Sequence, residues 1–397
     1  MKLLTPILLP IYLSTLLVSL DKAMIATVLP LYARSLGFSY GLVGVILAGE
    51  AIGMLITDLP AGALLRRIDR KYVMLVGVLV VALSSVLLVF AQAVWLLLIV
   101  RVLAGMAAGL FNVSLHAYLV EVSAVTGRGR AISMFGGVNR VGTFAGPLLA
   151  GGVAARAGLT SPFVLCAFFG VFAAAVVVLF VQKQASLNTP TGADQPAKQR
   201  LVQVAYENRQ LLATAGIAQL CAQGIRMGRK VVIPLVASSL GLNVQAIGVI
   251  LSVSAFIDMS LFYPAGWLMD TFGRKYAIVP CFLIQSIGML LVPLAAGFWG
   301  LLAATCLIGF GNGLGAGTMM TLGADLAPKH ALGEFLGLWR LIGDGGALIS
   351  PLLIGVIADV FTLGAGTVMI ALVGLAGTGL FAFGVPETNQ QARATPS

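Results

Sequence analysis

Two stretches of this sequence repeat each other at a fixed distance. The segment Pro60–Tyr72 begins Pro-Ala-Gly and ends Arg-Lys-Tyr, and Pro264–Tyr276 begins and ends with the same residues. The offset is 264 − 60 = 204 residues, about half of the 397-residue chain. The same offset relates prolines and glycines outside the segment, namely Pro30 and Pro234, Gly105 and Gly309, Gly109 and Gly313, Pro147 and Pro351, and Gly151 and Gly355. An offset kept over so much of the chain predicts two related structural halves joined head to tail.

The composition places both halves in a membrane. Hydrophobic residues make up 59% of the chain and charged residues only 10%, against about 25% charged in soluble domains. A soluble chain of this length would need a charged surface that this sequence lacks. Apolar runs such as 72–92, 161–182 and 276–297 have the roughly 20 residues that a helix needs to cross a bilayer. We therefore predict an all-α membrane protein.

The apolar runs predict twelve membrane-spanning helices, six in each half. They cover residues 5–32, 40–65, 72–92, 94–121, 131–155, 161–181, 209–237, 243–269, 275–297, 299–327, 332–360 and 364–385. The segment between the sixth and seventh spans is polar, which predicts a flexible connection. The predicted domains are an N-terminal six-helix bundle at 1–181, a cytoplasmic linker at 182–208, a C-terminal six-helix bundle at 209–387 and a disordered cytoplasmic tail at 388–397.

Positive charges in the loops indicate which side of the membrane each loop faces. One set of loops carries Arg66, Arg67, Arg70, Lys71, Arg128, Arg130, Lys183, Lys198, Arg200, Arg209, Arg274, Lys275 and Lys329. The opposite loops offer little beyond Arg34 and Arg156. By the positive-inside rule, both termini are cytoplasmic. The net charge of +10 is therefore a topology signal, and without a basic soluble module no nucleic-acid partner is expected.

The repeated loop carries a motif that resembles the loop signature of the major facilitator superfamily, Gly-x-x-x-Asp-x-x-Gly-Arg-Lys/Arg. The second half has the complete pattern in Gly266, Asp270, Gly273, Arg274 and Lys275. The first half matches it in Gly62, Arg70 and Lys71 but has Arg66 in place of the Asp and Asp69 in place of the second Gly. In that family, this loop acts on the equilibrium between conformations.

Two motifs inside the spans extend the resemblance over the chain. Arg101 with Gly105 resembles the fourth-span motif of the family, and Gly142, Gly146 and Pro147 resemble the fifth-span motif of its antiporters. The resemblance implies the major facilitator fold, which is two pseudo-symmetric bundles of six helices. It is closest to the twelve-span branch of drug:proton antiporters.

Ionisable residues at membrane depth are the candidates for the substrate and proton cavity. Each costs at least about 2.5–3.5 kcal/mol when it faces lipid, so such residues should face protein or water. The candidates are Asp21, Lys22, Glu50, Arg140, Arg226, Arg229, Lys230, Asp258, Arg340 and Asp344. The third, sixth, ninth and twelfth spans contain none in their cores, so these four should face lipid.

Each candidate has a structural interpretation beside the functional one. A buried ion pair can fix helix geometry, and Arg340 is spaced i, i+4 from Asp344 for a pair within one helix. Arg226, Arg229 and Lys230 share a helix face that needs carboxylates, water or an anionic ligand. Asp21 and Glu50 are the first candidates for the proton carrier, followed by Asp258 and Asp344.

These features predict a secondary transporter that works by alternating access. The leading hypothesis is proton-coupled export of a small amphipathic or drug-like compound. A lipid or glycolipid flippase and a proton-coupled metabolite importer are the alternatives. No nucleophile–base set, metal cluster or cofactor motif is present in the sequence, so we expect no enzyme, no cofactor and no metal. The expected protein is a monomer in the cell membrane, most simply a bacterial inner membrane, and its partners are substrate, protons and lipid.

The loop charges predict the outcome of cysteine labelling. A cysteine placed at Arg128 or Asn188 should react with a membrane-impermeant maleimide only from the cytoplasmic side, and one at Gly158 only from outside. The measurement compares right-side-out with inverted vesicles. Labelling with the opposite sidedness would overturn the predicted topology.

Overall fold

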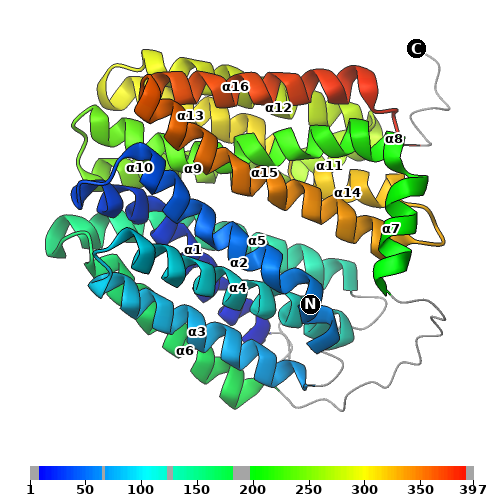
Figure 1. Ribbon diagram of the computed structural model, residues 1–397, viewed down its shortest axis with the longest axis horizontal. Coiled ribbons are helices and arrows are strands. Elements are labelled where there is room, and N and C mark those ends of the chain that lie inside the picture. The colour runs from blue at the N-terminus through cyan, green and yellow to red at the C-terminus, as the bar shows by residue number, and fades with distance from the viewer. Residues whose placement is uncertain (1–8, 65–67, 123–127, 182–196, 390–397) are drawn as a thin grey trace. The chain divides into compact units, whose positions relative to one another are not determined.

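A computed structural model describes residues 9–64, 68–122, 128–181 and 197–389 (Figure 1), with only the backbone described at 58–63, 120–122, 128–130 and 197–200. Within these ranges all regular secondary structure is helical. The helices of the first half are α1 (Leu9–Ser35), α2 (Tyr40–Leu64), α3 (Arg70–Phe90), α4 (Val94–Val122), α5 (Arg128–Ala157) and α6 (Ser161–Phe180). Each corresponds to one predicted span.

The second half contains several helices in two pieces. The seventh span is α8 (Arg209–Leu211), η2 (Leu212–Gly216) and α9 (Ile217–Ser239), and the eighth is α10 (Val244–Ser260) with α11 (Phe262–Thr271). The ninth is α12 (Arg274–Leu291) with η3 (Val292–Leu294), and the tenth is α13 (Gly297–Leu314) with α14 (Thr318–Leu326). The last two are α15 (Leu332–Val360) and α16 (Leu363–Gly379) with η4 (Leu380–Gly384). A helix therefore lies at every predicted span.

Ten of the described helical segments are long and apolar enough to cross a membrane. Of the twelve predicted spans, the two outside this group are those formed by α5 and α9. In α9, Arg226, Arg229 and Lys230 place three cations within every window of membrane-crossing length. In α5, several glycines and Arg140 lower the hydropathy. Both helices have enough residues to span, and their polar content suits an interior position rather than contact with lipid.

The prediction of a flexible linker at 182–208 was wrong for its C-terminal part. Residues Ala197–Glu207 form the helix α7, and residues 182–196 lie outside the described part of the chain. Although α7 is polar in composition, it is amphipathic: Val204 is buried and Leu201 half-buried, while Gln203 and Glu207 are exposed. Its contacts are with α15, so tertiary packing gives this polar segment a partner. Of the predicted tail at 388–397, residues 390–397 also lie outside the description.

Contacts within the chain divide it into two units. The first comprises Met1–Thr189 and Gly241–Ser252, and the second comprises Pro190–Leu240 and Val253–Ser397. In the first, α1 packs against α5 and α6, and α3 packs against α4 and α6. In the second, α9 packs against α15 and α16, and α12 packs against α13 and α16. Because each of these second-unit helices lies 204 residues after its first-unit counterpart, the sequence repeat is a repeat of helix packing.

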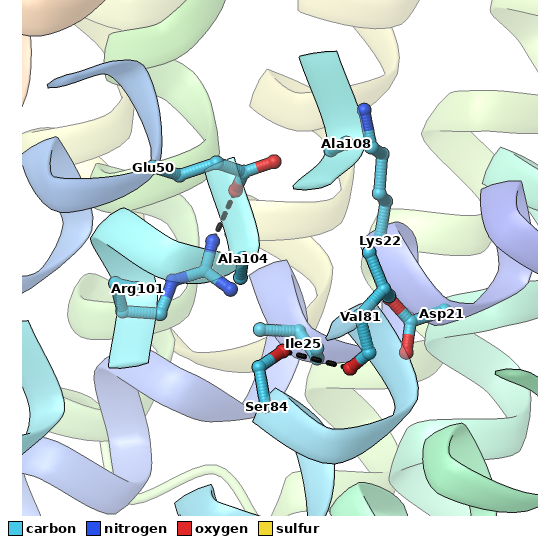
Figure 2. A pocket seen from close by; sticks show the side chains of 9 residues that line it. All are labelled: Asp21, Lys22, Ile25, Glu50, Val81, Ser84, Arg101, Ala104 and Ala108. Carbon is cyan, nitrogen blue, oxygen red and sulfur yellow. Dashed lines mark hydrogen bonds and ion pairs between the residues drawn. The ribbon is translucent and has the colours of Figure 1, made fainter. Parts of the chain in front are cut away.

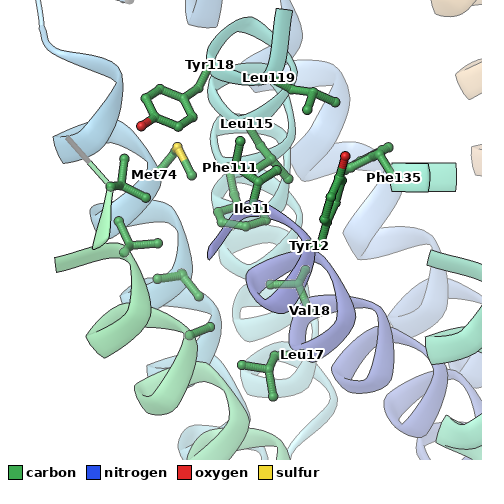
Figure 3. Packing of buried hydrophobic residues seen from close by; sticks show 14 of the residues in the cluster. Ile11, Tyr12, Leu17, Val18, Met74, Phe111, Leu115, Tyr118, Leu119 and Phe135 are labelled. Carbon is green, nitrogen blue, oxygen red and sulfur yellow. The ribbon is translucent and has the colours of Figure 1, made fainter. Parts of the chain in front are cut away.

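Large side chains fill the interior of the first unit (Figure 3). Tyr12 of α1, Met74 of α3, Phe111 and Tyr118 of α4, and Phe135 of α5 are all buried in one cluster. Lipid tails are as apolar as these side chains, so in a bilayer the cluster stabilises the unit chiefly through close packing and dispersion.

The outer surface of α3 is an apolar stripe. Val76, Leu79, Leu83 and Phe90 are 53%, 44%, 56% and 71% exposed, and their spacing places them along one side of the helix. No charge interrupts the stripe between them. Such a surface suits contact with acyl chains, which agrees with the prediction that the third span faces lipid.

A very close helix contact in the first unit depends on Gly105. A Cβ placed on this residue of α4 would lie 2.1 Å from the backbone oxygen of Glu50 on α2. The contact recurs in the second unit, where a Cβ on Gly309 would lie 2.4 Å from the oxygen of Ser254. Both members of the pair are shifted by 204 residues, since 105 + 204 = 309 and 50 + 204 = 254. Glycine at this position lets the backbones approach closely.

We expect Gly105→Ala to destabilise the protein, because the new methyl group meets backbone that cannot rotate away. Overpacking of this kind costs about 1–3 kcal/mol. The matched control is Gly136→Ala in α5, where a Cβ would meet nothing within 4 Å and the change should be neutral or slightly stabilising. The measurement is the unfolding temperature in detergent, and equal values for the two variants would contradict the prediction.

Candidate functional site

A small cavity in the first unit collects several of the predicted residues (Figure 2). Four helices line it, α1 to α4, and its volume of about 10 Å³ for the centres of water molecules is roughly the room for one water. The lining residues are Asp21, Lys22, Ile25, Glu50, Val81, Ser84, Arg101, Ala104 and Ala108. The cavity therefore brings together Asp21, Lys22 and Glu50, which were predicted as cavity residues, with Arg101, which was predicted only as part of a span motif.

Glu50 and Arg101 form a direct ion pair across this cavity. The Arg101 guanidinium donates to Glu50 Oε2; the Arg101 side chain is 7% exposed and the Glu50 side chain 30% exposed. The geometry follows from the glycine contact, because Gly105 brings α4 against the backbone of Glu50 and Arg101 lies one turn away. Gly49 adds to this approach, since a Cβ there would lie 3.0 Å from the Cβ of Arg101. The Glu50 charge is thus neutralised by protein.

Asp21 is the more deeply buried carboxylate of the cavity, at 3% exposure. Its Oδ1 accepts a hydrogen bond from the Ser85 hydroxyl at 3.2 Å, and its backbone oxygen accepts from the Cys166 thiol at 3.8 Å. The ion pairs among the described residues do not include Asp21. Lys22 follows it in α1 and lines the same cavity. Asp21 therefore has a hydroxyl partner where Glu50 has a cation.

The fifth-span motif positions α1, which carries these two residues. A Cβ on Gly142 would lie 2.5 Å from the Cβ of Ser19, and one on Gly146 would lie 2.5 Å from the Cβ of Ala23. The two glycines therefore contact α1 on either side of Asp21 and let α5 pack closely against it. Pro147 is buried directly after the second contact.

In the second unit, Asp258 of α10 contacts Asn312 and Arg229. The Asn312 side-chain amide donates to Asp258 Oδ2 at 2.7 Å, and Arg229 Nη2 lies 3.8 Å from the same oxygen. Asp258 is buried at 8% exposure. Sequence reasoning missed Asn312, although an amide within the apolar tenth span is itself a sign of a buried polar contact.

The three cations of α9 do not share one environment. Arg226 donates to the backbone oxygen of Gly315, where α13 ends, at 2.9 Å, and its guanidinium lies 5.2 Å from the centre of the Phe282 ring. Arg229 pairs with Asp258, whereas Lys230 is exposed. Arg229 therefore has a carboxylate partner, as this helix face requires, whereas the partner of Arg226 is a backbone carbonyl at the end of a helix.

The remaining predicted cavity residues lie on α5 and α15. Arg340 Nε is 3.7 Å from Asp344 Oδ2, the i, i+4 pair within one helix. Arg140 is half-buried on α5. No group of three His, Cys, Asp or Glu side chains that could hold a metal ion occurs among the residues that the structure describes.

The complete loop motif forms a charge network in the second unit. Arg274 Nη1 lies 2.9 Å from Asp270 Oδ1, and Arg274 Nε lies 3.0 Å from Asp325 Oδ2 at the end of α14. Lys275 Nζ donates to the Ala382 oxygen at 2.8 Å. A Cβ on Gly266 would meet nothing within 4 Å.

The first-half loop keeps one of these contacts and alters another. Lys71 Nζ donates to the Val178 oxygen at 2.8 Å, which is the Lys275 contact shifted by 204 residues. Asp69, which stands in place of the motif glycine, caps α3 by accepting from the Lys71 backbone N–H at 2.8 Å. Of the other motif residues in this half, Arg70 begins α3, Gly62 is described by its backbone alone, and Arg66 lies outside the described residues.

Sequence comparisons agree on one family. The sequence profile of the Major Facilitator Superfamily matches residues 11–227 and 215–396. An MFS-type transporter of Methanocaldococcus jannaschii is 23% identical over 350 residues, which cover 88% of this chain and 90% of that protein. The multidrug resistance protein MdtH of Escherichia coli is 26% identical over 300 residues, which cover 72% of this chain and 70% of that protein.

Solved structures share the fold. The nucleoside transporter NupG matches with a TM-score of 0.78 at 10% identity, covering 95% of this chain and 99% of its own. A POT family transporter in complex with a thioalcohol-conjugated peptide matches with a TM-score of 0.76 at 11% identity, covering 94% and 95%. At these identities the likeness concerns the fold alone.

Proposed function

The chain belongs to the major facilitator superfamily and is a multi-pass membrane transporter rather than an enzyme; we propose that it exports a small amphipathic or drug-like compound in exchange for protons. The relative named as a multidrug resistance protein supports the substrate class. The loop charges support a cell-membrane location with both termini in the cytoplasm.

The proposal rests chiefly on the unequal environments of the two carboxylates in the first-unit cavity. Arg101 already neutralises Glu50, so protonation of Glu50 would leave a buried cation without its partner. Asp21 accepts from Ser85 and takes part in none of the ion pairs among the described residues, so it can bind a proton without breaking an ion pair. We therefore infer that Asp21 carries the proton and that Glu50 is structural.

Exchange of substrate for protons follows from electrostatics if Asp21 is accessible from one side of the membrane at a time. With Asp21 protonated, the four cavity charges sum to +1, from Lys22, Arg101 and Glu50. With Asp21 ionised they sum to zero. In a conformation that opens the cavity to one side, protonation adds a positive charge beside the substrate and disfavours a cationic compound there, so each turnover can export substrate as a proton enters.

Transport into inverted vesicles tests the function. Ethidium, rhodamine 6G and chloramphenicol are amphipathic probes of different charge, and each is measured with and without an imposed pH gradient. Accumulation that depends on an acidic vesicle interior supports exchange for protons. An importer would instead take up its compound into right-side-out vesicles on external acidification, and a flippase would move a fluorescent phospholipid between leaflets.

Substitution of the two carboxylates should separate their roles. We expect Asp21→Asn to fold normally, to lose accumulation driven by the pH gradient and to retain part of the downhill exchange, because the amide mimics the protonated carboxyl. Glu50→Gln should instead strand Arg101, at a cost of about 3–5 kcal/mol, and lower the unfolding temperature. Unfolding in detergent and both transport modes are measured for each variant. An Asp21→Asn protein that still concentrates a probe against its gradient would overturn the assignment.

A further inference from the structure

The C-terminal segment 385–389 is bound to the loop motif of the second unit. The Glu387 carboxylate accepts hydrogen bonds from the backbone N–H groups of Arg274 at 2.9 Å and Lys275 at 3.0 Å, the first two residues of α12. It also accepts from Thr388 and Asn389 at 2.9 and 3.0 Å, which folds the segment around the carboxylate. A carboxylate at a helix N-terminus satisfies N–H groups that lack a partner within the helix and complements the helix dipole.

The motif glycine provides the space for this carboxylate. Gly273 has φ of 115°, which favours glycine, and a Cβ on it would lie 2.7 Å from Glu387 Oε2. In the first half, residue 273 − 204 = 69 is Asp69, and it caps its own helix α3. The counterpart of Glu387 is residue 387 − 204 = 183, which is Lys183. The two halves thus cap the same helix start differently, from within the loop in one and from the end of the chain in the other.

The other residues of the segment contact the charge network of the loop. The Thr388 hydroxyl donates to Asp325 Oδ2 at 2.9 Å, the oxygen that also pairs with Arg274. The Asn389 side-chain amide donates to the backbone oxygen of Asp270 at 3.1 Å. Arg274 lies between Asp270 and Asp325, so the segment reaches both ends of this network as well as its centre.

We propose that Glu387 is a positioning residue of the transport cycle: by holding the start of α12 it fixes Arg274 between Asp270 and Asp325, and so sets the conformational equilibrium that the loop controls. Glu387 acts through the loop and is not one of the residues that line the cavity described above. The proposal rests on the conformational role that the resemblance to the family implies for this loop, not on the identity of the substrate or the coupling ion.

Glu387 holds the segment against the start of α12 at neutral pH and does not act as a pH sensor. Burial raises the pKa of Glu387, but the four backbone N–H donors more than offset this and lower the pKa below its ordinary value of 4.5. Because the pKa of Glu387 is lowered in the folded protein, its contribution to stability is complete at pH values above the ordinary pKa of a Glu side chain. This contribution is lost only as the pH falls through the lowered pKa. The carboxylate therefore stays ionised near neutral pH, and its contribution is separate from the protonation proposed for Asp21.

The test uses two readouts that need neither substrate nor gradient. Hydrogen–deuterium exchange of the first turn of α12 reports on the hydrogen bonds from its N–H groups to Glu387. Reaction of a Ser84→Cys reporter in the cavity with an impermeant maleimide, in right-side-out and inverted vesicles, reports on the conformational equilibrium. In Glu387→Ala we expect exchange at Arg274 and Lys275 to rise about tenfold or more, the size expected for losing a charge-assisted hydrogen bond, and the inside-to-outside labelling ratio to shift by a similar factor.

The controls separate positioning from general destabilisation. Thr362 caps the N-terminus of α16 by accepting from the Ala365 N–H. Thr362→Ala therefore removes a helix cap from the same unit and should leave both readouts unchanged. Asp270→Asn should shift the labelling ratio, and the double variant Asp270→Asn with Glu387→Ala should shift it no further than the larger single effect.

Three results would overturn the proposal. They are faster exchange in Glu387→Ala with an unchanged labelling ratio, an equal shift in Thr362→Ala, and additive shifts in the double variant. An unchanged ratio in Asp270→Asn would refute the role of the loop, and the proposal with it. Failure of proton-driven transport would refute the proposed coupling alone, because neither readout depends on it.

Discussion

The close approach of α4 to α2 at Gly105 is the contact on which the first-unit site depends. Membrane helices gain little from leaving lipid for protein, so their association depends on backbone approach and close packing. At Gly105 the approach is so close that a methyl group would lie 2.1 Å from the Glu50 oxygen. One turn away, Arg101 then meets the Glu50 carboxylate. A small residue thereby determines which two charges meet, and Asp21 is the cavity carboxylate that has a hydroxyl partner instead of a direct ion pair among the described residues.

The repeat preserves packing and changes chemistry. Glu50 and Arg101 correspond to Ser254 and Thr305, and the Ser254 hydroxyl donates to the Thr305 backbone oxygen at 2.8 Å. The contact between the helices is therefore retained while the ion pair is replaced by a neutral hydrogen bond. The loops differ in the same manner, with Asp69 as a local cap in one half and Glu387 as a distant one in the other. Two halves with one architecture thus hold an ion pair in one and a neutral hydrogen bond at the same contact in the other.

Much of the fold was predictable because its causes are local. The twelve helical positions follow from apolar runs of membrane-crossing length, and the family follows from motif residues at fixed spacing. The linker prediction failed over Ala197–Glu207 because polar composition was taken to mean flexibility, whereas contacts with α15 give that amphipathic segment a partner. The Arg340–Asp344 pair could be anticipated because both residues belong to one helix and the period of 3.6 residues brings them together.

Partners on different helices could not be anticipated. Glu50 with Arg101, Asn312 with Asp258 and Glu387 with Arg274 join residues 51, 54 and 113 positions apart. Their meeting depends on how each helix is rotated and how closely its neighbour approaches, which many distant contacts decide together. The sequence by itself determined the spans, the repeat and the set of charges that must avoid lipid, because helix length and the cost of a bare charge are local properties. The tertiary structure alone decided which charge neutralises which, because that depends on side chains meeting across helices.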